Sequence, residues 1–277
     1  MKWILLFILF GLVQYLAIGQ SAKEILNQMD SAITSVNHLQ CDFYKKERIE
    51  NEYEISLSLL KVQKSPFKVY LKSDTPREGL EVLFRDGIND NDVLICTNTF
   101  PFFNLNFDPL GSTLRNKQHH TVYDLGFTTM QSLFHQFKAN NPHYDSYLKL
   151  HDDTLFEHQE CYKVEIDYID FTWNDYTVKK GEDFCSIAVQ FGVNDYMIME
   201  RNGFDDYDDI DEGDVIQVPN NYARSTFLYI SKKTLLPIKQ VVYDDLGLYE
   251  FYEYRNLVVN PSFEHNELDD TYSAYGF

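Results

Sequence analysis

Apolar residues recur at helical spacing in residues 22–38. They lie three or four positions apart and so share one face of a helix, at Ala22, Ile25, Leu26, Met29, Ile33 and Val36. Ser21 and Glu24 have the spacing of a capping box, in which the side chain of each accepts a hydrogen bond from the backbone of the other. The pattern predicts an amphipathic helix that ends near His38.

From about residue 41 onward, strand-like segments take over. In some of these segments apolar residues alternate with polar ones, which is typical of strands with one buried face, and in others strand-forming residues follow one another directly. The segments are residues 54–59, 67–71, 162–168, 226–230, 238–242 and 248–254. Residues 128–138 have the pattern of a short helix, and residues 245–247 that of a hairpin turn. The chain is therefore predicted to have an α+β fold built on an antiparallel, twisted sheet.

One segment interrupts this sheet pattern. Residues 176–219 read YTVKKGEDFCSIAVQFGVNDYMIMERNGFDDYDDIDEGDVIQVP. The order of parts is a short strand, a turn at Gly181, a helix, a second helix that ends at Asn202, and a closing strand. In residue type and spacing the segment resembles a LysM module. The resemblance implies a βααβ fold that binds polymers containing N-acetylglucosamine, such as peptidoglycan.

The LysM resemblance also indicates where a glycan would bind, in a shallow groove between two loops. The residues carried over are Gly181, Glu182, Asp183 and Phe184 in the first loop, and Asp208, Asp209 and Ile210 in the second. Gly181 suits a sharp turn of the chain, and Phe184 and Ile210 are predicted to supply apolar contacts. Asn202 is predicted to close the second helix rather than to touch sugar.

Two features of this copy oppose sugar binding. Asp183 stands where LysM modules usually have a hydroxyl residue, and residues 204–209 hold four carboxylates. Because peptidoglycan carries carboxylates of its own, like-charge repulsion would lower the affinity, although salt screens it. We predict that the module binds glycan. The alternative is a module that serves only as a spacer or a protein-docking surface.

The LysM-like segment lies between strand-like segments, and no Ser-, Gly- or Pro-rich tether flanks it. We infer that it is inserted into a host domain rather than appended to one. The predicted organisation is a signal peptide at residues 1–19, a first host part at 20–174, the module at 175–219, and a second host part at 220–277.

The host resembles a bacterial family of uncharacterised exported proteins and, more distantly, the periplasmic lipoprotein carriers (LolA-like). The likeness lies in the order of elements, an N-terminal helix followed by the strand-like residues 39–43, 59–62, 65–70, 230–237 and 242–247. It implies an unclosed half-barrel with covering helices and an interior for acyl chains. A lipid, a lipoprotein or another envelope partner is therefore the predicted ligand of the host.

The start of the chain and its charge indicate where the protein acts. Residues 2–16 form a positively charged start and an apolar run, and residues 17–19 are small, as a signal peptidase requires. Export to the periplasm or cell envelope is predicted, with no membrane span left after cleavage. The formal net charge of −19 would repel nucleic acids and anionic membrane surfaces, and nucleic acid is excluded as a partner.

Four cysteines are present, and an even number permits two disulfides in three connectivities. They are Cys41, Cys96, Cys161 and Cys185. Four is a low number for a chain of this length, and cysteine is often simply a small core residue. Free, buried thiols are predicted, with Cys185 as an apolar filler of the first module helix.

Two aromatic clusters and one histidine pair are candidate ligand sites. The aromatic residues are Tyr249, Phe251, Tyr252 and Tyr254, and Phe100, Phe102, Phe103 and Phe107. A filled aromatic core is favoured over a ring-lined cavity. His119 and His120 are interpreted as an exposed loop, because no metal-ligand partners lie nearby in the sequence. The acidic runs in residues 205–209 lack the spacing of a calcium loop and indicate a solvated surface.

Recognisable catalytic motifs are missing from the sequence, including the Gly-x-Ser-x-Gly elbow, His-Glu-x-x-His and a phosphate-binding glycine loop. No catalytic residue, metal or cofactor is predicted. The favoured function is that of a non-enzymatic envelope binding protein that attaches to peptidoglycan or another N-acetylglucosamine polymer. A protein-interaction scaffold is the alternative, and a peptidoglycan hydrolase is a less favoured one.

Overall fold

The computed structural model describes residues 20–97, 99–100, 103–207 and 209–277. The predicted signal peptide at residues 1–19 lies outside the described residues. Within the described ranges, no helix has both the length and the apolar character needed to cross a membrane.

Helix α1 (Ala22–Thr34) is the predicted N-terminal helix. Its capping box is present, because the Ser21 N–H donates to Glu24 Oε2 (2.8 Å) and the Glu24 N–H donates to Ser21 Oγ (3.2 Å). The helix ends about one turn earlier than predicted. His38 instead begins strand β1, where it pairs with Gln63, and the carbonyl of Asn37 already accepts from the Lys64 N–H (2.8 Å).

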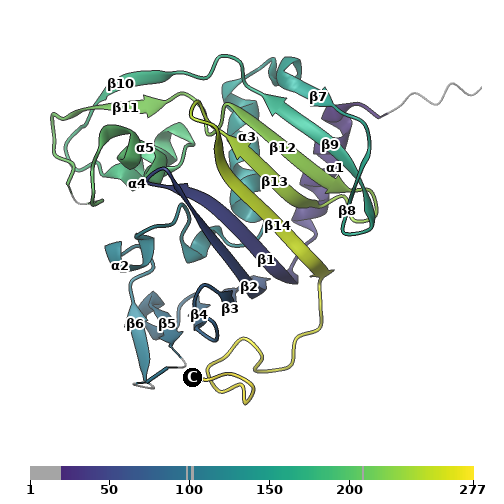
Figure 1. Ribbon diagram of the computed structural model, residues 1–277, viewed down its shortest axis with the longest axis vertical. Helices are drawn as coiled ribbons and strands as arrows, with labels where there is room; N and C mark the ends of the chain where they lie inside the picture. The colour runs from purple at the N-terminus through teal and green to yellow at the C-terminus, as the bar shows by residue number, and fades with distance from the viewer. Residues whose placement is uncertain (1–19, 98, 101–102, 208) are drawn as a thin grey trace, which may run out of the picture.

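Most strands of the chain belong to one antiparallel sheet (Figure 1). Its order is β6-β5-β4-β3-β2-β1-β14-β13-β12-β9-β7, with β8 paired to β9. The strands are β1 (His38–Ile49), β2 (Glu52–Lys64), β3 (Phe67–Thr75), β4 (Glu81–Arg85), β5 (Val93–Cys96), β6 (Asn104–Phe107), β7 (Leu148–Leu150), β8 (Thr154–Phe156), β9 (Gln159–Asp167), β12 (Ser225–Ser231), β13 (Pro237–Tyr243) and β14 (Leu248–Val259). Because β6 and β7 lie at opposite ends of this path, the sheet is unclosed among the described residues.

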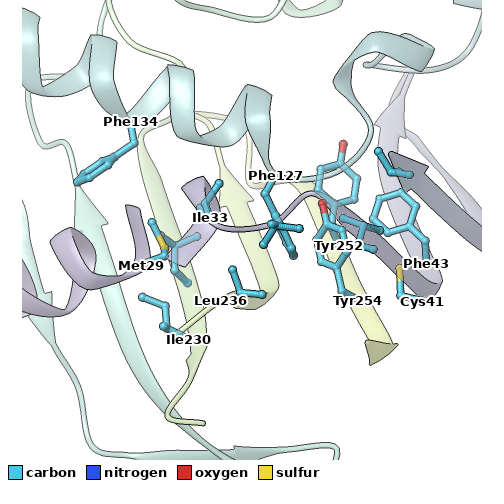
Figure 2. Close-up of a cluster of buried hydrophobic side chains, with 14 of the residues drawn as sticks. Met29, Ile33, Cys41, Phe43, Phe127, Phe134, Ile230, Leu236, Tyr252 and Tyr254 are labelled. Carbon is cyan, nitrogen blue, oxygen red and sulfur yellow. The ribbon is translucent and has the colours of Figure 1, made fainter. Parts of the chain in front are cut away.

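Two helices cover the inner face of the sheet. Helix α3 (Thr128–Asn140) lies beside α1 on this face (Figure 1). The connecting segments carry helix α2 (Ser112–Arg115) and the 3-10 turns η1 (Asn89–Asn91), η2 (Val122–Asp124) and η3 (Tyr144–Tyr147). Figure 2 shows side chains of α1, α3 and the inner strand face meeting in the main core, among them Met29, Phe43, Phe134 and Tyr254. The predicted α+β fold with an unclosed sheet and covering helices is confirmed.

Between β9 and β12 the chain forms a smaller βααβ unit. It consists of β10 (Trp173–Thr177), α4 (Phe184–Phe191), α5 (Asp195–Asn202) and β11 (Val215–Pro219). The Asp183 carboxylate caps α4 by accepting from the Ser186 N–H (2.7 Å), and Asn194 Oδ1 caps α5 by accepting from the Met197 N–H (3.1 Å). β10 and β11 pair antiparallel as a separate two-stranded sheet. The predicted order of elements is therefore present.

The two ends of this βααβ unit are tied to one another. The Thr172 N–H donates to Asn220 Oδ1 (3.0 Å), and the Asn220 N–H donates to the Thr172 carbonyl (3.0 Å). Asn220 Nδ2 also donates to the Asp170 carbonyl (2.9 Å). The chain thus leaves and re-enters the host at one point, and β9 and β12 remain paired neighbours in the large sheet.

The last residues of the chain pack on the outer face of β2, β3 and β4. Tyr275 stacks on Tyr70 with the ring centroids 3.7 Å apart. Lys61 Nζ donates to Glu267 Oε1 (2.7 Å), and Arg85 pairs with Asp269 (3.0 Å). The tail therefore covers apolar side chains that would otherwise face water.

Candidate functional site

A cavity of about 680 Å³ lies between the inner face of the sheet and the segment that carries α2 and α3. Most of its lining is apolar, including Phe43, Leu71, Val82, Ile95, Met130, Phe134, Phe137, Leu228 and Tyr252. Cavities of this size are typical of sites that enclose one small molecule. The host is therefore hollow where a filled core was favoured from the sequence.

Two buried carboxylates line one end of the cavity. Glu47 on β1 and Glu250 on β14 are direct cross-strand partners, and they are 0% and 1% exposed. The Tyr252 hydroxyl donates to Glu47 (2.6 Å), and the Tyr222 hydroxyl donates to Glu250 (2.8 Å). Lys45 Nζ lies 2.9 Å from Glu47. Buried charge is tolerated only when it is paired and hydrogen-bonded, and both carboxylates meet that condition.

The two adjacent histidines contact the same carboxylate, Glu250. Its Oε1 atom lies 2.9 Å from His119 Nδ1 and 3.2 Å from His120 Nε2. His119 Nε2 donates to the Arg48 carbonyl (2.8 Å), and the His119 residue is only 3% exposed. The segment is a loop, as interpreted from the sequence, but it is not exposed, because His119 is buried and the His120 side chain is only 19% exposed.

The charges at this end of the cavity stabilise one another. Burial disfavours the charged form of Glu47, but the nearby Lys45 and His119 outweigh burial and lower the pKa of Glu47 to about 2. Burial also disfavours a charged His120, but Glu250 and Asp124 outweigh it and raise the pKa of His120 well above its usual value. At neutral pH this end of the cavity therefore holds carboxylates and a protonated His120.

The βααβ unit is docked against this charged end of the host. The His119 ring stacks on Tyr249 of β14 and on Tyr196 of α5, with centroids 4.0 Å and 5.0 Å away. Asn194 Nδ2 donates to the His119 carbonyl (2.8 Å), and the Tyr249 hydroxyl donates to Asn194 Oδ1 (2.8 Å). Ile49, at the end of β1, packs in the core of the unit. The contact is buried and combines rings, amides and an aliphatic side chain.

Arg48 and Arg115 add ion pairs to the same junction. Arg48 forms a pair with Asp244 of the host and lies 3.9 Å from Glu200 of α5. Arg115, at the end of α2, pairs with Asp195 of α5, and its guanidinium lies 3.3 Å from the ring centroid of Tyr207. Both arginines are largely buried. The unit is thus held in a fixed orientation from two sides.

The docked unit also forms part of the cavity wall. Phe191 and Gly192, at the end of α4, line the cavity together with Gln136 of α3. Gly192 adopts a left-handed φ of +69°, and a Cβ at this position would lie 2.3 Å from the Gln136 side chain. The left-handed backbone favours glycine here, and a Cβ would require the flexible end of the Gln136 side chain to move aside.

The structure brings the two predicted glycan-binding loops together. The Phe184 ring lies 5.3 Å from Phe204 and 6.4 Å from Tyr207, which belong to the second loop. Phe184 is 0% exposed, so its ring belongs to the core of the unit and does not supply the apolar contact expected of it. Ile210 is partly buried against the same core. Any contact of Phe184 with a glycan is left to its backbone.

The remaining predicted residues line the exposed edges of the loops. Gly181 has a φ of +78°, and the space next to it is open. Glu182 accepts from the Lys179 N–H (2.8 Å) and the Tyr176 hydroxyl (2.8 Å), which lower its pKa. Asp183 is exposed and caps α4, Asp209 is exposed, and Asp208 lies outside the described residues. Glu182 and Asp183 therefore shape the first loop.

Asn202 has the structural role that was predicted for it. It is the last residue of α5, and its side chain ties the helix to β11. The Gln217 N–H donates to Asn202 Oδ1 (2.7 Å), and Asn202 Nδ2 donates to the Gln217 carbonyl (2.9 Å).

Comparison with known families identifies both parts of the chain. Residues 176–219 match the LysM domain model, which confirms the predicted module. Residues 36–180, more than half of the chain, match the family described as "Protein of unknown function (DUF1571)". The chain belongs to the DUF1571 family. No curated protein matches this DUF1571 chain.

Several solved structures are similar to the DUF1571 chain at low identity. A putative outer membrane lipoprotein-sorting protein domain from Vibrio parahaemolyticus is 11% identical, with a TM-score of 0.35 over 90% of this chain and 97% of that one. A LolA superfamily protein from Nitrosomonas europaea is 8% identical, with a TM-score of 0.32 over 88% and 96%. The Mycobacterium tuberculosis lipoprotein LppX is 7% identical, with a TM-score of 0.42 over 87% and 97%.

The two aromatic clusters of the DUF1571 chain differ in their burial. Tyr252 and Tyr254 line the cavity, while Tyr249 is fully buried against His119. Phe100 and Phe103 are 87% and 48% exposed, so the interpretation as core is wrong for them. Phe107 packs at the margin of the core, and Phe102 lies outside the described residues. Clusters of aromatic residues in the sequence therefore correspond to the cavity wall in one case and to the protein surface in the other.

The four cysteines are free, as predicted. Cys41, Cys96 and Cys161 are buried in strands, and burial raises the pKa of the Cys41 and Cys161 thiols. Cys185 is only partly buried, in contrast to its predicted role as a buried filler. Among the described residues, no group of three or more His, Cys, Asp or Glu side chains is arranged to hold a metal ion.

Sequence reasoning missed the carboxylates at the end of the cavity. Glu250 lies in phase with Tyr252 and Tyr254 on the inward face of β14, and Glu47 lies in phase with Phe43 on β1. A charged residue at an inward position of an alternating strand indicates a buried partner or a polar site. The position of each glutamate on the same strand face as buried aromatic residues is the sequence feature that could have predicted this polar site.

Proposed function

We propose that this DUF1571 protein is an exported, non-enzymatic binding protein of the cell envelope. Its LysM module binds a glycan that contains N-acetylglucosamine, and its host domain holds an apolar ligand close to that glycan. The observation that carries the proposal is the LysM module docked beside a mainly apolar cavity and lining part of its wall. Periplasmic localisation is part of the proposal.

Glycan binding is supported by the exposed edge of the two module loops. Gly181, Asp183 and Asp209 are exposed there, and the left-handed turn at Gly181 leaves open space beside the backbone. LysM-type recognition relies on backbone groups that accept a neutral acetylated sugar. The acidic residues nearby would weaken attachment at low ionic strength and do so less as salt screens them.

Sedimentation with purified insoluble peptidoglycan tests this half of the proposal. The chain from residue 20 onward should co-sediment, and more strongly at about 150 mM salt than at about 10 mM, because the Debye length falls from about 30 Å to about 8 Å. Gly181→Val should abolish co-sedimentation by distorting the loop.

Gly247→Val is the matched control, because Gly247 also has a left-handed φ (+121°) and open space around it but lies in a host hairpin. It should lose a similar amount of stability and keep glycan binding. Wild-type protein that stays in solution at every salt concentration would reject glycan binding and favour a protein-docking role for the module. Soluble muropeptides released during the assay would instead indicate a hydrolase.

Ligand binding by the host is supported by the size and lining of the cavity. Its wall is mainly apolar, and its charged end is internally neutralised by ion pairs. Apolar surface of this kind binds apolar ligands through the hydrophobic effect. A lipid with an acyl chain is the ligand class that this lining favours.

Mass spectrometry of organic extracts tests this second half. Protein purified without detergent should release an acyl-chain lipid in near-stoichiometric amount. Leu71→Trp, which adds a ring inside the cavity, should reduce that amount strongly. Leu155→Trp adds the same ring at a site that is 71% exposed and should have no effect. A wild-type extract without lipid, in repeated preparations, would contradict the proposed host function.

A further inference from the structure

Several polar side chains interrupt the apolar wall of the cavity, and the buried, uncharged ones are two serines and a glutamine. Ser58, Ser73 and Gln240 all line it and are 5%, 7% and 7% exposed. Within the part of the chain that the structure describes, these three side chains form no hydrogen bond, and their polar atoms keep some accessible surface, since only Arg48 Nε is fully buried there without a partner. A ligand that displaces water from these atoms must replace the lost hydrogen bonds, because a polar group left unpaired costs free energy. Their open hydrogen-bonding capacity faces the cavity.

The three side chains mark two separate points on the wall. Ser58 on β2 and Ser73 on β3 are direct cross-strand partners, so their hydroxyls lie side by side. Gln240 lies on β13, four strands along the sheet from β3. With neighbouring strands about 4.8 Å apart, the two points are separated by roughly 15 to 19 Å. Phe43 and Tyr252 lie between them on β1 and β14.

The charged side chains inside the cavity are already paired. Lys45 is bonded to Glu47, and His120 lies against Glu250 and Asp124. Arg77, Lys117 and Glu54 also line the cavity, but all three are exposed to solvent. A ligand with its own buried charge would therefore lack a free counter-charge beside the wall, and desolvating such a charge is costly. A neutral group with hydroxyl or ester oxygens meets no such cost.

We propose that the cavity selects an uncharged acyl-chain lipid that carries hydroxyl or ester groups, of the glyceride class. Its polar groups bond to Ser58, Ser73 and Gln240, and its chain lies on the apolar wall between and around them. This selectivity rests on the proposed ligand-binding function of the host. The ligand class is then defined by hydrogen bonds to these three side chains.

Calorimetric titration with three ligands of one chain length tests the selectivity. The probes are monolauroylglycerol, laurate and lauroyl lysophosphatidylglycerol, each below its critical micelle concentration. The uncharged monolauroylglycerol should bind at least ten-fold more tightly than either anion. Equal affinities, or tighter binding of an anion, would overturn the selectivity while leaving the host a lipid-binding domain. Absence of binding by all three would reject the host function itself.

Side-chain variants test the named residues. Ser58→Ala and Gln240→Leu should each weaken monolauroylglycerol binding about three- to ten-fold, the usual range for one lost hydrogen bond. Neither should change laurate binding. Because both side chains are unpartnered in the protein, neither change should lower the urea midpoint.

Ser231→Ala is the matched control for these variants. Ser231 is also buried, but its hydroxyl bonds to Gln159 (3.1 Å) and it does not line the cavity. This variant should lose stability and keep wild-type affinity for monolauroylglycerol. Wild-type affinity in both Ser58→Ala and Gln240→Leu would contradict the assignment of these residues.

Discussion

The His119 imidazole joins the host to the LysM module more directly than any other side chain described above. Its two nitrogens face Glu250 and the Arg48 carbonyl, and its ring lies against Tyr249 and Tyr196. The backbone carbonyl of the same residue accepts from Asn194. Removing such a group leaves several buried polar atoms without a partner. That cost exceeds the net contribution of each hydrogen bond taken alone.

His119→Ala should therefore lower the free energy of unfolding by about 2 to 4 kcal/mol, from lost hydrogen bonds and the cavity left behind. Urea denaturation monitored by tyrosine fluorescence measures this. His135→Ala is the comparison, because His135 pairs with Asp30 at the exposed surface (2.7 Å) and should cost less than about 1 kcal/mol. Equal losses in the two variants would argue against a junction role for His119.

The charged cluster predicts a stability maximum in mildly acidic solution. The pKa of Glu47 is lowered to about 2 from 4.5, so its contribution is complete above about pH 4.5 and is lost as the pH falls toward 2. The pKa of His120 is raised above 6.5, so its contribution is complete below pH 6.5 and is lost as the pH rises. Urea midpoints should therefore peak between about pH 4.5 and 6.5.

His120→Gln separates these two limbs. The variant should flatten the decline on the alkaline side and keep the decline on the acidic side, which belongs to Glu47. A wild-type alkaline limb in His120→Gln would assign that limb to other groups.

The conformation of a single residue could be predicted from the sequence only where residues close to it in the chain determine that conformation. The capping box of α1 and the turn at Gly181 depend on local contacts, and both are present. The burial of His119 depends on Glu250 and Tyr249, more than a hundred residues away. Phe184 looked available for sugar because its sequence position fits the loop, while its ring fills the core of the module.

Helices and strands followed their periodicity closely, because burial of one face is a local pattern. α3, β9 and the helices of the module lie where they were predicted. The pairing of β1 with β14 was not predictable, since alternation marks a strand without naming its neighbour. Alternation also looks the same for a filled core and a hollow one, which is why the cavity was missed.

The approach of α4 to α3 gives a prediction at the level of elements. Gly192→Ala should cost about 1 to 2 kcal/mol from the left-handed backbone, with a smaller addition because the flexible end of Gln136 must move away from the new Cβ. Gln136→Ala should restore only the contact part. A double-mutant cycle by urea denaturation measures this coupling. Strict additivity would mean that the Gln136 side chain does not press on residue 192 in solution.

The whole molecule depends on its C-terminal tail to cover the outer face of the sheet. Ending the chain after Val259 would uncover Tyr70 and Leu83 and remove the pair of Lys61 with Glu267. The free energy of unfolding should fall by about 3 to 5 kcal/mol, from the apolar surface exposed. Thermal denaturation of the truncated chain measures it.

Tyr275→Phe is the control for this truncation. It removes the hydroxyl that accepts from Lys61 (3.2 Å) and keeps the ring stacked on Tyr70, so it should cost less than about 1 kcal/mol. An unchanged melting temperature in the truncated chain would show that the outer face is stable without its cover.

The hydrogen-bonded joint at Thr172 and Asn220 has a mechanical consequence. Tension on a glycan held by the module would divide between β10 and β11, which leave the host together. Torque would be resisted by the buried contacts of Arg48, Arg115 and His119. The module and the host would then move as one rigid body. A ligand in the cavity would keep a constant distance and orientation relative to the glycan chain that the module binds.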